Sequence, residues 1–109
     1  MKRAELEQLT ALAGLRADRS AARLARLQSA IDALAARAAA LRAPMSEPPG
    51  SIADAVMRDR WDRWRSEQVR QTNQRILKLE AAAQPLREAR ARDQARAEVL
   101  KRLRQSARG

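Results

Sequence analysis

The side chains of this chain that could do chemistry are mostly basic, and Trp61 and Trp64 are its only aromatic residues. Lysine and arginine number 23 against 13 acidic residues, which leaves a net charge of +10. Such a charge favours an anionic partner: an acidic protein, nucleic acid or an acidic lipid surface. Histidine and cysteine are absent, so the usual acid–base groups and thiol nucleophiles are missing. The residue types therefore indicate binding rather than catalysis.

No residue pattern predicts a catalytic, cofactor or metal site. The three glycines stand too far apart in the sequence to build a phosphate-binding loop. The carboxylates and serines are spread along the chain without a base beside them, and nothing has the spacing of metal ligands. We expect a protein that is not an enzyme, with no cofactor and no small-molecule substrate.

The basic residues are most concentrated near the C-terminal end, where residues 90–109 carry seven of them against two acidic residues. Val99, Leu100 and Leu103 supply apolar side chains within the same stretch. We predict that this stretch contacts an acidic protein partner, and the alternative is a solvated tail without a specific role. The predicted contact residues are Arg90, Arg92, Arg96, Leu100, Lys101, Arg102, Leu103 and Arg104.

The two tryptophans lie three residues apart, so Trp61 and Trp64 share one face of a helix. Two interpretations are open. Both rings could pack in a seam between helices. Alternatively, one edge could stay exposed as an anchor for a partner, since tryptophan is enriched at binding hot spots.

Prolines divide the chain into two helices that must position these side chains. Three of the four prolines lie within residues 43–51, and the rest of the chain is rich in strong helix formers. Ser51 is a good N-cap for the second helix. We predict a single domain over residues 1–109, with a helix over 3–42, a turn over 43–51 and a helix over 52–105. Pro85 should kink the second helix, or else begin a third one.

Small and apolar residues recur in steps of three and four along both helices, as in a coiled coil. This pattern predicts an all-α fold, a long antiparallel two-helix coiled-coil hairpin with a C-terminal helical overhang. The seam of the first helix is predicted at Leu6, Thr10, Ala13, Ala17, Ser20, Leu24, Leu27, Ile31, Leu34, Ala38 and Leu41. The seam of the second is predicted at Met57, Trp61, Trp64, Gln68, Thr72, Ile76, Leu79, Ala83 and Leu86.

The overhang follows from a tight turn near residue 47, which would pair residues whose numbers sum to roughly 95 to 98. Trp61 and Trp64 would then pack on the small residues 33–39. Leu6 would lie opposite residue 90, where the first helix is used up. Residues 91–109 would therefore be unpaired and free to bind the partner.

We expect a cytoplasmic protein without membrane insertion. The longest run free of charge covers residues 8–15, far short of the roughly 18 apolar residues that span a bilayer. Glu5 and Glu7 interrupt any apolar region behind the basic first residues, which argues against a signal peptide.

One stretch of the second predicted helix resembles the FliJ/YscO family, the stalk proteins of flagellar and injectisome type III export. The run reads Arg60-Trp61-Asp62-Arg63-Trp64-Arg65-Ser66-Glu67-Gln68. Leu79-Glu80 and the basic residues 97–104 are similar to features that follow in that family. Trp64 stands where a tyrosine is typical of the family.

The resemblance implies a non-enzymatic coiled-coil stalk that inserts into a hexameric export ATPase, stimulates it and links it to the export gate protein. The alternative is a generic cytoplasmic coiled-coil adaptor or a chaperone-like scaffold, with the same fold and another partner. A basic nucleic-acid-binding helical protein is less favoured. Acidic residues interrupt the basic runs before residue 90, and neither tryptophan is placed to stack on bases.

Overall fold

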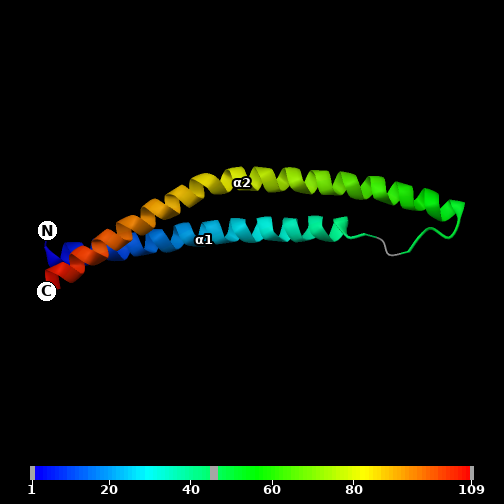
Figure 1. Cartoon of the computed structure of the whole chain (residues 1–109). Helices are drawn as coiled ribbons and strands as arrows, with labels where there is room; N and C mark the ends of the chain where they lie inside the picture. Colours follow the sequence, from blue (N-terminus) through cyan, green and yellow to red (C-terminus); the bar gives the residue numbers. More distant parts are fainter. Residues whose placement is uncertain (1, 45–46, 109) are drawn as a thin grey trace. The chain divides into compact units, whose positions relative to one another are not determined.

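The computed structural model describes residues 2–44 and 47–108, without the side chain of Arg108. The chain is all-α, with helix α1 over Arg3–Arg42 and helix α2 over Ile52–Arg108. The two helices pack against each other as an antiparallel hairpin (Figure 1). This confirms the predicted two-helix hairpin, and the second helix is the longer one.

The ends of the two helices at the connection lie where the sequence predicts them. α1 ends at Arg42, and Pro44 follows at once. α2 begins directly after Ser51, whose Oγ accepts a hydrogen bond from the amide of Asp54 at 3.1 Å. This bond satisfies one of the free amides of the first turn and confirms Ser51 as the N-cap. Residues 45 and 46 of the predicted turn lie outside the described residues.

α2 continues through Pro85 without a break and ends at Arg108. The alternative of a third helix that begins at Pro85 is therefore wrong. The missing amide of a proline removes one backbone hydrogen bond from its turn. Strong helix formers on both sides, such as the alanines of residues 81–83, offset that loss. The kink predicted near Pro85 stays a prediction.

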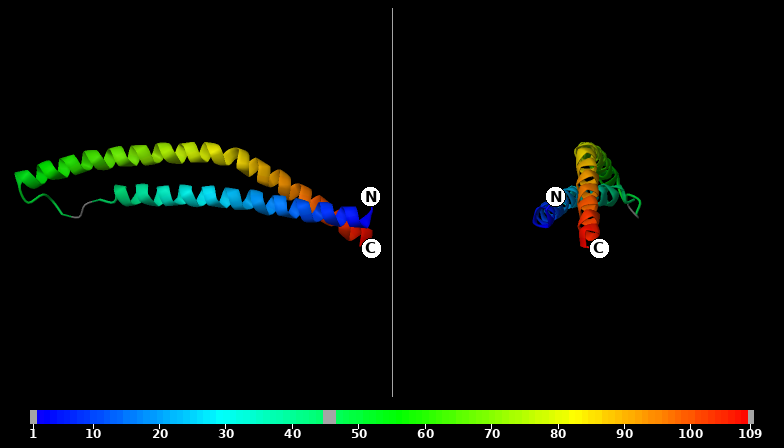
Figure 2. Two further views of the ribbon diagram at one scale, coloured as in Figure 1. Left: turned by 180° about the vertical axis from the view of Figure 1, so that it is seen from behind. Right: turned by 90° about the vertical axis from the view of Figure 1, so that its left-hand side faces the viewer.

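The hairpin forms two compact units, each with one segment from α1 and one from α2. The first unit combines Met1–Gln28 with Ala81–Gly109, and the second consists of Ser29–Glu80. In each unit the two helical segments run antiparallel, as two further views also show (Figure 2). The segments of the first unit are nearly equal in length. In the second unit the α2 segment is much the longer of the two.

The predicted seam is confirmed over most of its length. In α1 every predicted seam position is buried or half-buried, most deeply Leu6, Ile31 and Ala38. In α2 the seam positions from residue 68 to residue 86 are also buried or half-buried, and Ala83 has no exposed surface. The larger seam residues confirmed in this way are Leu24, Leu27, Ile31, Leu34, Ile76 and Leu79.

The two threonines of the seam satisfy their hydroxyl groups within their own helices. Thr10 donates to the carbonyl of Leu6, and the buried Thr72 donates to the carbonyl of Gln68, both at 2.7 Å. Because each hydroxyl bonds one turn back, a polar side chain enters the seam without an unpaired group. The seam therefore continues through both positions.

The register between the helices differs from the predicted one. In the first unit Ser20 donates a hydrogen bond to the carboxylate of Asp93, and Arg87 donates to the Oε1 of Gln28 at 3.4 Å. Paired residue numbers therefore sum to about 114, rather than to roughly 95 to 98. The end of α2 lies along the start of α1 in this unit. The prediction that residues 91–109 form an unpaired C-terminal overhang is wrong.

The length of the connection explains this difference. An extended chain covers up to about 3.3 Å per residue, so residues 43–51 can reach about 30 Å. The described residues of the connection contain no helix. This length allows α2 to begin well past the end of α1. Within the second unit, the first turns of α2 run beyond the end of α1 (Figures 1 and 2).

The tryptophans lie on this unpaired start of α2, so their predicted packing on residues 33–39 is wrong. Trp61 is 39% exposed and Trp64 is 51% exposed. Met57, one turn earlier on the same face, is also exposed. All three continue the seam of α2, but α1 ends before it can cover them.

Replacing Gly14 by alanine should stabilise the hairpin by about 0.5–1 kcal/mol, because glycine is costly inside a helix. A Cβ atom at Gly14 would meet no other atom within 4 Å. Urea unfolding should show a higher midpoint with an unchanged slope. The exchange of the exposed Ala11 for glycine is the control and should lower the midpoint by a similar amount. A lower midpoint for Gly14→Ala would mean that this position tolerates no side chain.

Candidate functional site

The first candidate surface is the exposed stripe of Met57, Trp61 and Trp64 on α2, here called the tryptophan face. These residues follow one another at steps of four and three, so they lie on one side of the helix. Ile52 and Val56 add further exposed apolar surface beside the stripe. So much exposed apolar area in one short helical segment is typical of a binding surface.

Arg65 joins the tryptophan face to the end of α1. Its guanidinium lies over the ring of Trp61, 5.1 Å from the ring centroid. It also pairs with Asp62 at 3.2 Å and donates to the carbonyl of Ala43 at 3.5 Å. A cation beside the last carbonyls of a helix is favourable, because the helix dipole is negative there. Arg65 therefore holds one face of Trp61 in a fixed environment and leaves the rest of the ring exposed.

Ion pairs within α2 lie on other sides of the helical segment that carries the tryptophan face. Arg63 pairs with Asp59 at 3.0 Å, and Arg70 pairs with Glu67 at 2.5 Å. The hydrogen bonds that Glu67 accepts from Arg70, and then from Gln71, hold the pKa of this carboxyl below its usual value. The same bond from Arg70 to Glu67 raises the pKa of the arginine. Both groups therefore stay charged near neutral pH.

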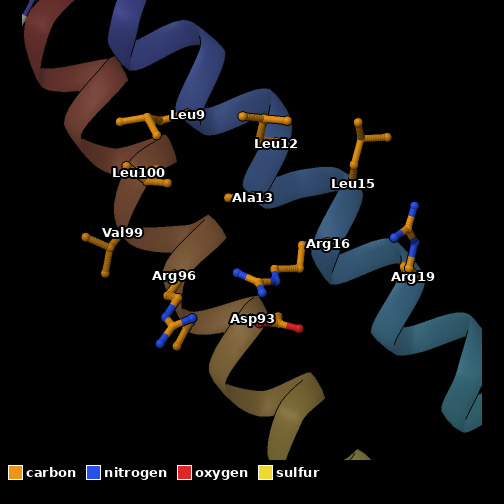
Figure 3. Close-up of a pocket in the computed structure, with 11 residues that line it drawn as sticks. Leu9, Leu12, Ala13, Leu15, Arg16, Arg19, Asp93, Arg96, Val99 and Leu100 are labelled. Atoms are coloured by element: carbon orange, nitrogen blue, oxygen red, sulfur yellow. The ribbon is translucent and has the colours of Figure 1, made fainter.

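The second candidate surface is a groove between the two helices of the first unit, with a volume of about 860 Å³. Its apolar lining comes from both helices, and we call it the leucine groove: Leu9, Leu12 and Leu15 of α1, with Val99 and Leu100 of α2. Figure 3 shows Leu9 and Leu100 near each other between the helices, with the small Ala13 beside them. The groove is therefore apolar where the two helices meet.

Charged residues border the leucine groove, and all but one of them are basic. Arg16, Arg19 and Arg96 line it together with Asp93. Asp93 accepts the hydrogen bond from Ser20, and Arg16 reaches from α1 toward it in Figure 3. Among the described residues, none of these three arginines has a carboxylate within ion-pair distance. The positive charges at the groove are thus available to an incoming group.

The eight residues predicted to bind a partner do not form one continuous face. Arg96 and Leu100 line the leucine groove, and Arg104 is half-buried. The others are exposed at several angles around α2: Arg90, Arg92, Lys101, Arg102 and Leu103. The premise that this segment is unpaired is wrong, because it packs along the start of α1. The predicted set contains none of the groove residues of α1, such as Leu9, Leu12 and Leu15.

The sequence does contain a signal for the α1 side of the groove. Residues 8–15 are the longest run free of charge, and they hold Leu9, Leu12 and Leu15 at steps of three. These leucines lie outside the predicted seam, so they mark a second apolar stripe on the same helix. An apolar stripe that the seam does not bury is a candidate for another contact.

Comparisons with known proteins add no relative: no family model, no curated protein and no solved structure matches this chain. Over residues 2–44 and 47–108, no cluster of acidic side chains could hold a metal ion. Within the same described ranges, neither helix contains a stretch apolar enough to cross a bilayer.

Proposed function

We propose that this chain is a non-enzymatic stalk of a flagellar or injectisome type III export apparatus in the cytoplasm. In this role it inserts into a hexameric export ATPase, stimulates it and links it to the export gate protein. The observation that carries the proposal is the exposure of the tryptophan face. Trp61 and Trp64, the aromatic residues of the run 60–68 that resembles the FliJ/YscO family, lie on the part of α2 that α1 does not cover.

The tryptophan face has the physical properties of a protein anchor. Each indole offers a large and rigid apolar surface, so binding immobilises few torsions for the area that it buries. Arg65 already fixes one side of Trp61. The paired charges of Asp59 and Arg63 lie on the opposite side of α2, so they can stay hydrated while a partner buries the tryptophan face.

ATP hydrolysis would belong to the partner in this proposal. The chain contains no histidine and no cysteine, and its few glycines offer no loop for a phosphate group. The contribution of the chain would be mechanical and positional. A helical hairpin of this kind can enter the central pore of a ring and contact several subunits.

Addition of the purified chain to the hexameric export ATPase of the same organism tests the proposal. We expect the ATPase rate to rise with the native chain. With the double variant Trp61→Ala and Trp64→Ala, binding should weaken by about 30-fold or more, as is usual for a hot-spot tryptophan. Circular dichroism should show the same helix content, because both rings are exposed in the free chain.

The matched control is Leu77→Ala in the second unit, which removes an exposed apolar side chain away from the tryptophan face. This variant should stimulate the ATPase like the native chain. No stimulation and no co-purification of the native chain would contradict the stalk proposal.

The second candidate is a coiled-coil adaptor or chaperone-like scaffold that joins two other proteins. The leucine groove favours it, because a second exposed apolar surface lies in the first unit, whereas the tryptophan face lies in the second. Loss of ATPase stimulation together with retained binding at both surfaces would support the adaptor.

A further inference from the structure

We propose that the leucine groove binds an amphipathic helix with acidic flanks that belongs to another protein. This inference goes beyond the stalk function and does not depend on it. The groove lies in the first unit and the tryptophan face in the second, so each surface can be tested while the other is intact.

The shape of the groove suits a helix. It runs between two antiparallel helices, and the small side chain of Ala13 lies where they meet (Figure 3). A third helix can pack its own ridge of side chains into such a space. Helices that bind in grooves present apolar residues at steps of three and four, which matches a narrow apolar lining.

The lining is apolar and open to solvent in the free chain. Leu12 is 63% exposed and Leu15 is 65% exposed, while Leu9 and Val99 are also exposed. Leu100 is half-buried at the junction of the helices. Removal of these side chains from water gives a helical partner a favourable hydrophobic contribution.

The positive charge around the groove favours a partner helix that carries acidic side chains. Arg16, Arg19 and Arg96 border it without a carboxylate partner among the described residues. The sequence segments of the first unit carry 14 of the 23 basic residues and only 6 of the 13 acidic ones. Glutamate or aspartate on the flanks of the incoming helix would pair with these arginines and direct its approach.

Other occupants fit less well. A second copy of this chain in a two-fold interface would bring Arg16, Arg19 and Arg96 against the same residues of its partner. Nucleic acid would pair with the arginines but leave the leucines in water. A lipid surface would contact the exposed Leu12 and Leu15 but leave the half-buried Leu100 uncovered.

A designed peptide provides the test. The probe is a fluorescently labelled peptide of about 20 residues, long enough for a helix of about 30 Å. It carries leucine at helical spacing and glutamate on both flanks. We expect this peptide to bind the full chain in an anisotropy titration. The same peptide with lysine in place of glutamate should bind at least about tenfold more weakly.

Two variants of the chain assign the binding to the groove. Leu12→Ser combined with Leu15→Ser should weaken binding of the acidic peptide by about tenfold or more, with unchanged helix content. Leu77→Ser in the second unit is the matched control, because this exposed leucine lies outside the groove. Arg16→Glu combined with Arg19→Glu should reverse the preference, so that the lysine-flanked peptide binds better.

Three results would overturn the proposal. One is equal binding of an acidic peptide whose leucines are scrambled, which would mean that charge alone drives the contact. Another is full binding to the Leu12→Ser and Leu15→Ser variant. The third is that a random DNA duplex or anionic lipid vesicles bind more tightly than the acidic peptide, and that the same leucine variant abolishes this binding. That outcome would assign the groove to nucleic acid or to a membrane surface.

Discussion

A cysteine pair at positions 20 and 93 should be joined within one chain by a short thiol cross-linker. The native chain contains no cysteine, so Ser20→Cys with Asp93→Cys introduces the only two thiols. The hydrogen bond between the native side chains places these positions side by side in the first unit. Mass spectrometry of the digested monomer should identify the cross-linked peptides in high yield.

The matched control places the two cysteines at Leu6 and Leu86, which the tight-turn register would bring together. With paired numbers that sum to about 114, Leu6 lies near the end of α2 instead, about 22 residues from Leu86 along the helix. At 1.5 Å per residue this is a separation of about 33 Å, beyond the reach of a short cross-linker. Efficient cross-linking of this control, with none at 20 and 93, would restore the tight-turn register. Cross-links only between two chains would indicate a swapped dimer.

The seam could be predicted from the sequence, but the register could not, for a geometric reason. The steps of three and four determine which side of each helix is buried, because they follow the helical repeat. A slide by whole heptads keeps both seams facing each other, and the observed register differs from the predicted one by roughly two to three heptads. Ile31 and Leu79 were therefore assigned to the seam correctly. The residues predicted to lie opposite them on the other helix were wrong.

The register of the two helices explains which predictions failed at the tryptophan face and at the leucine groove. The interpretation of Trp61 and Trp64 as seam residues is wrong, because α1 ends before it reaches them. The alternative interpretation expected the edge of one ring to stay exposed, and both rings are exposed in the structure. Their role as an anchor for a partner stays a proposal. The leucine groove required the spatial pairing of residues 9–19 with residues 93–100. No pattern within either helix alone contains that information.

Phenylalanine in place of Ala38 or Ala83 should destabilise the hairpin by about 1–3 kcal/mol, because each alanine lies where the helices meet and has no room to grow. Ala38 is 1% exposed in the second unit, and Ala83 is 0% exposed in the first. Each kcal/mol should lower the melting temperature by about 4–8 °C for a protein of this size. Thermal melts followed by circular dichroism would measure the loss in each variant.

The neighbouring alanines are the matched controls, since Ala39→Phe and Ala82→Phe add the same ring to exposed positions of the same helices. Both exchanges carry the same small cost in helix propensity, so the difference within each pair isolates the effect of the seam. A loss for Ala39→Phe as large as that for Ala38→Phe would contradict the assigned seam. A large loss at Ala38 and Ala83 alone would show that closely spaced helices, held by small side chains, stabilise both units. An exchange of Ala38 in the second unit should leave the leucine groove intact, because every residue that lines it belongs to the first unit.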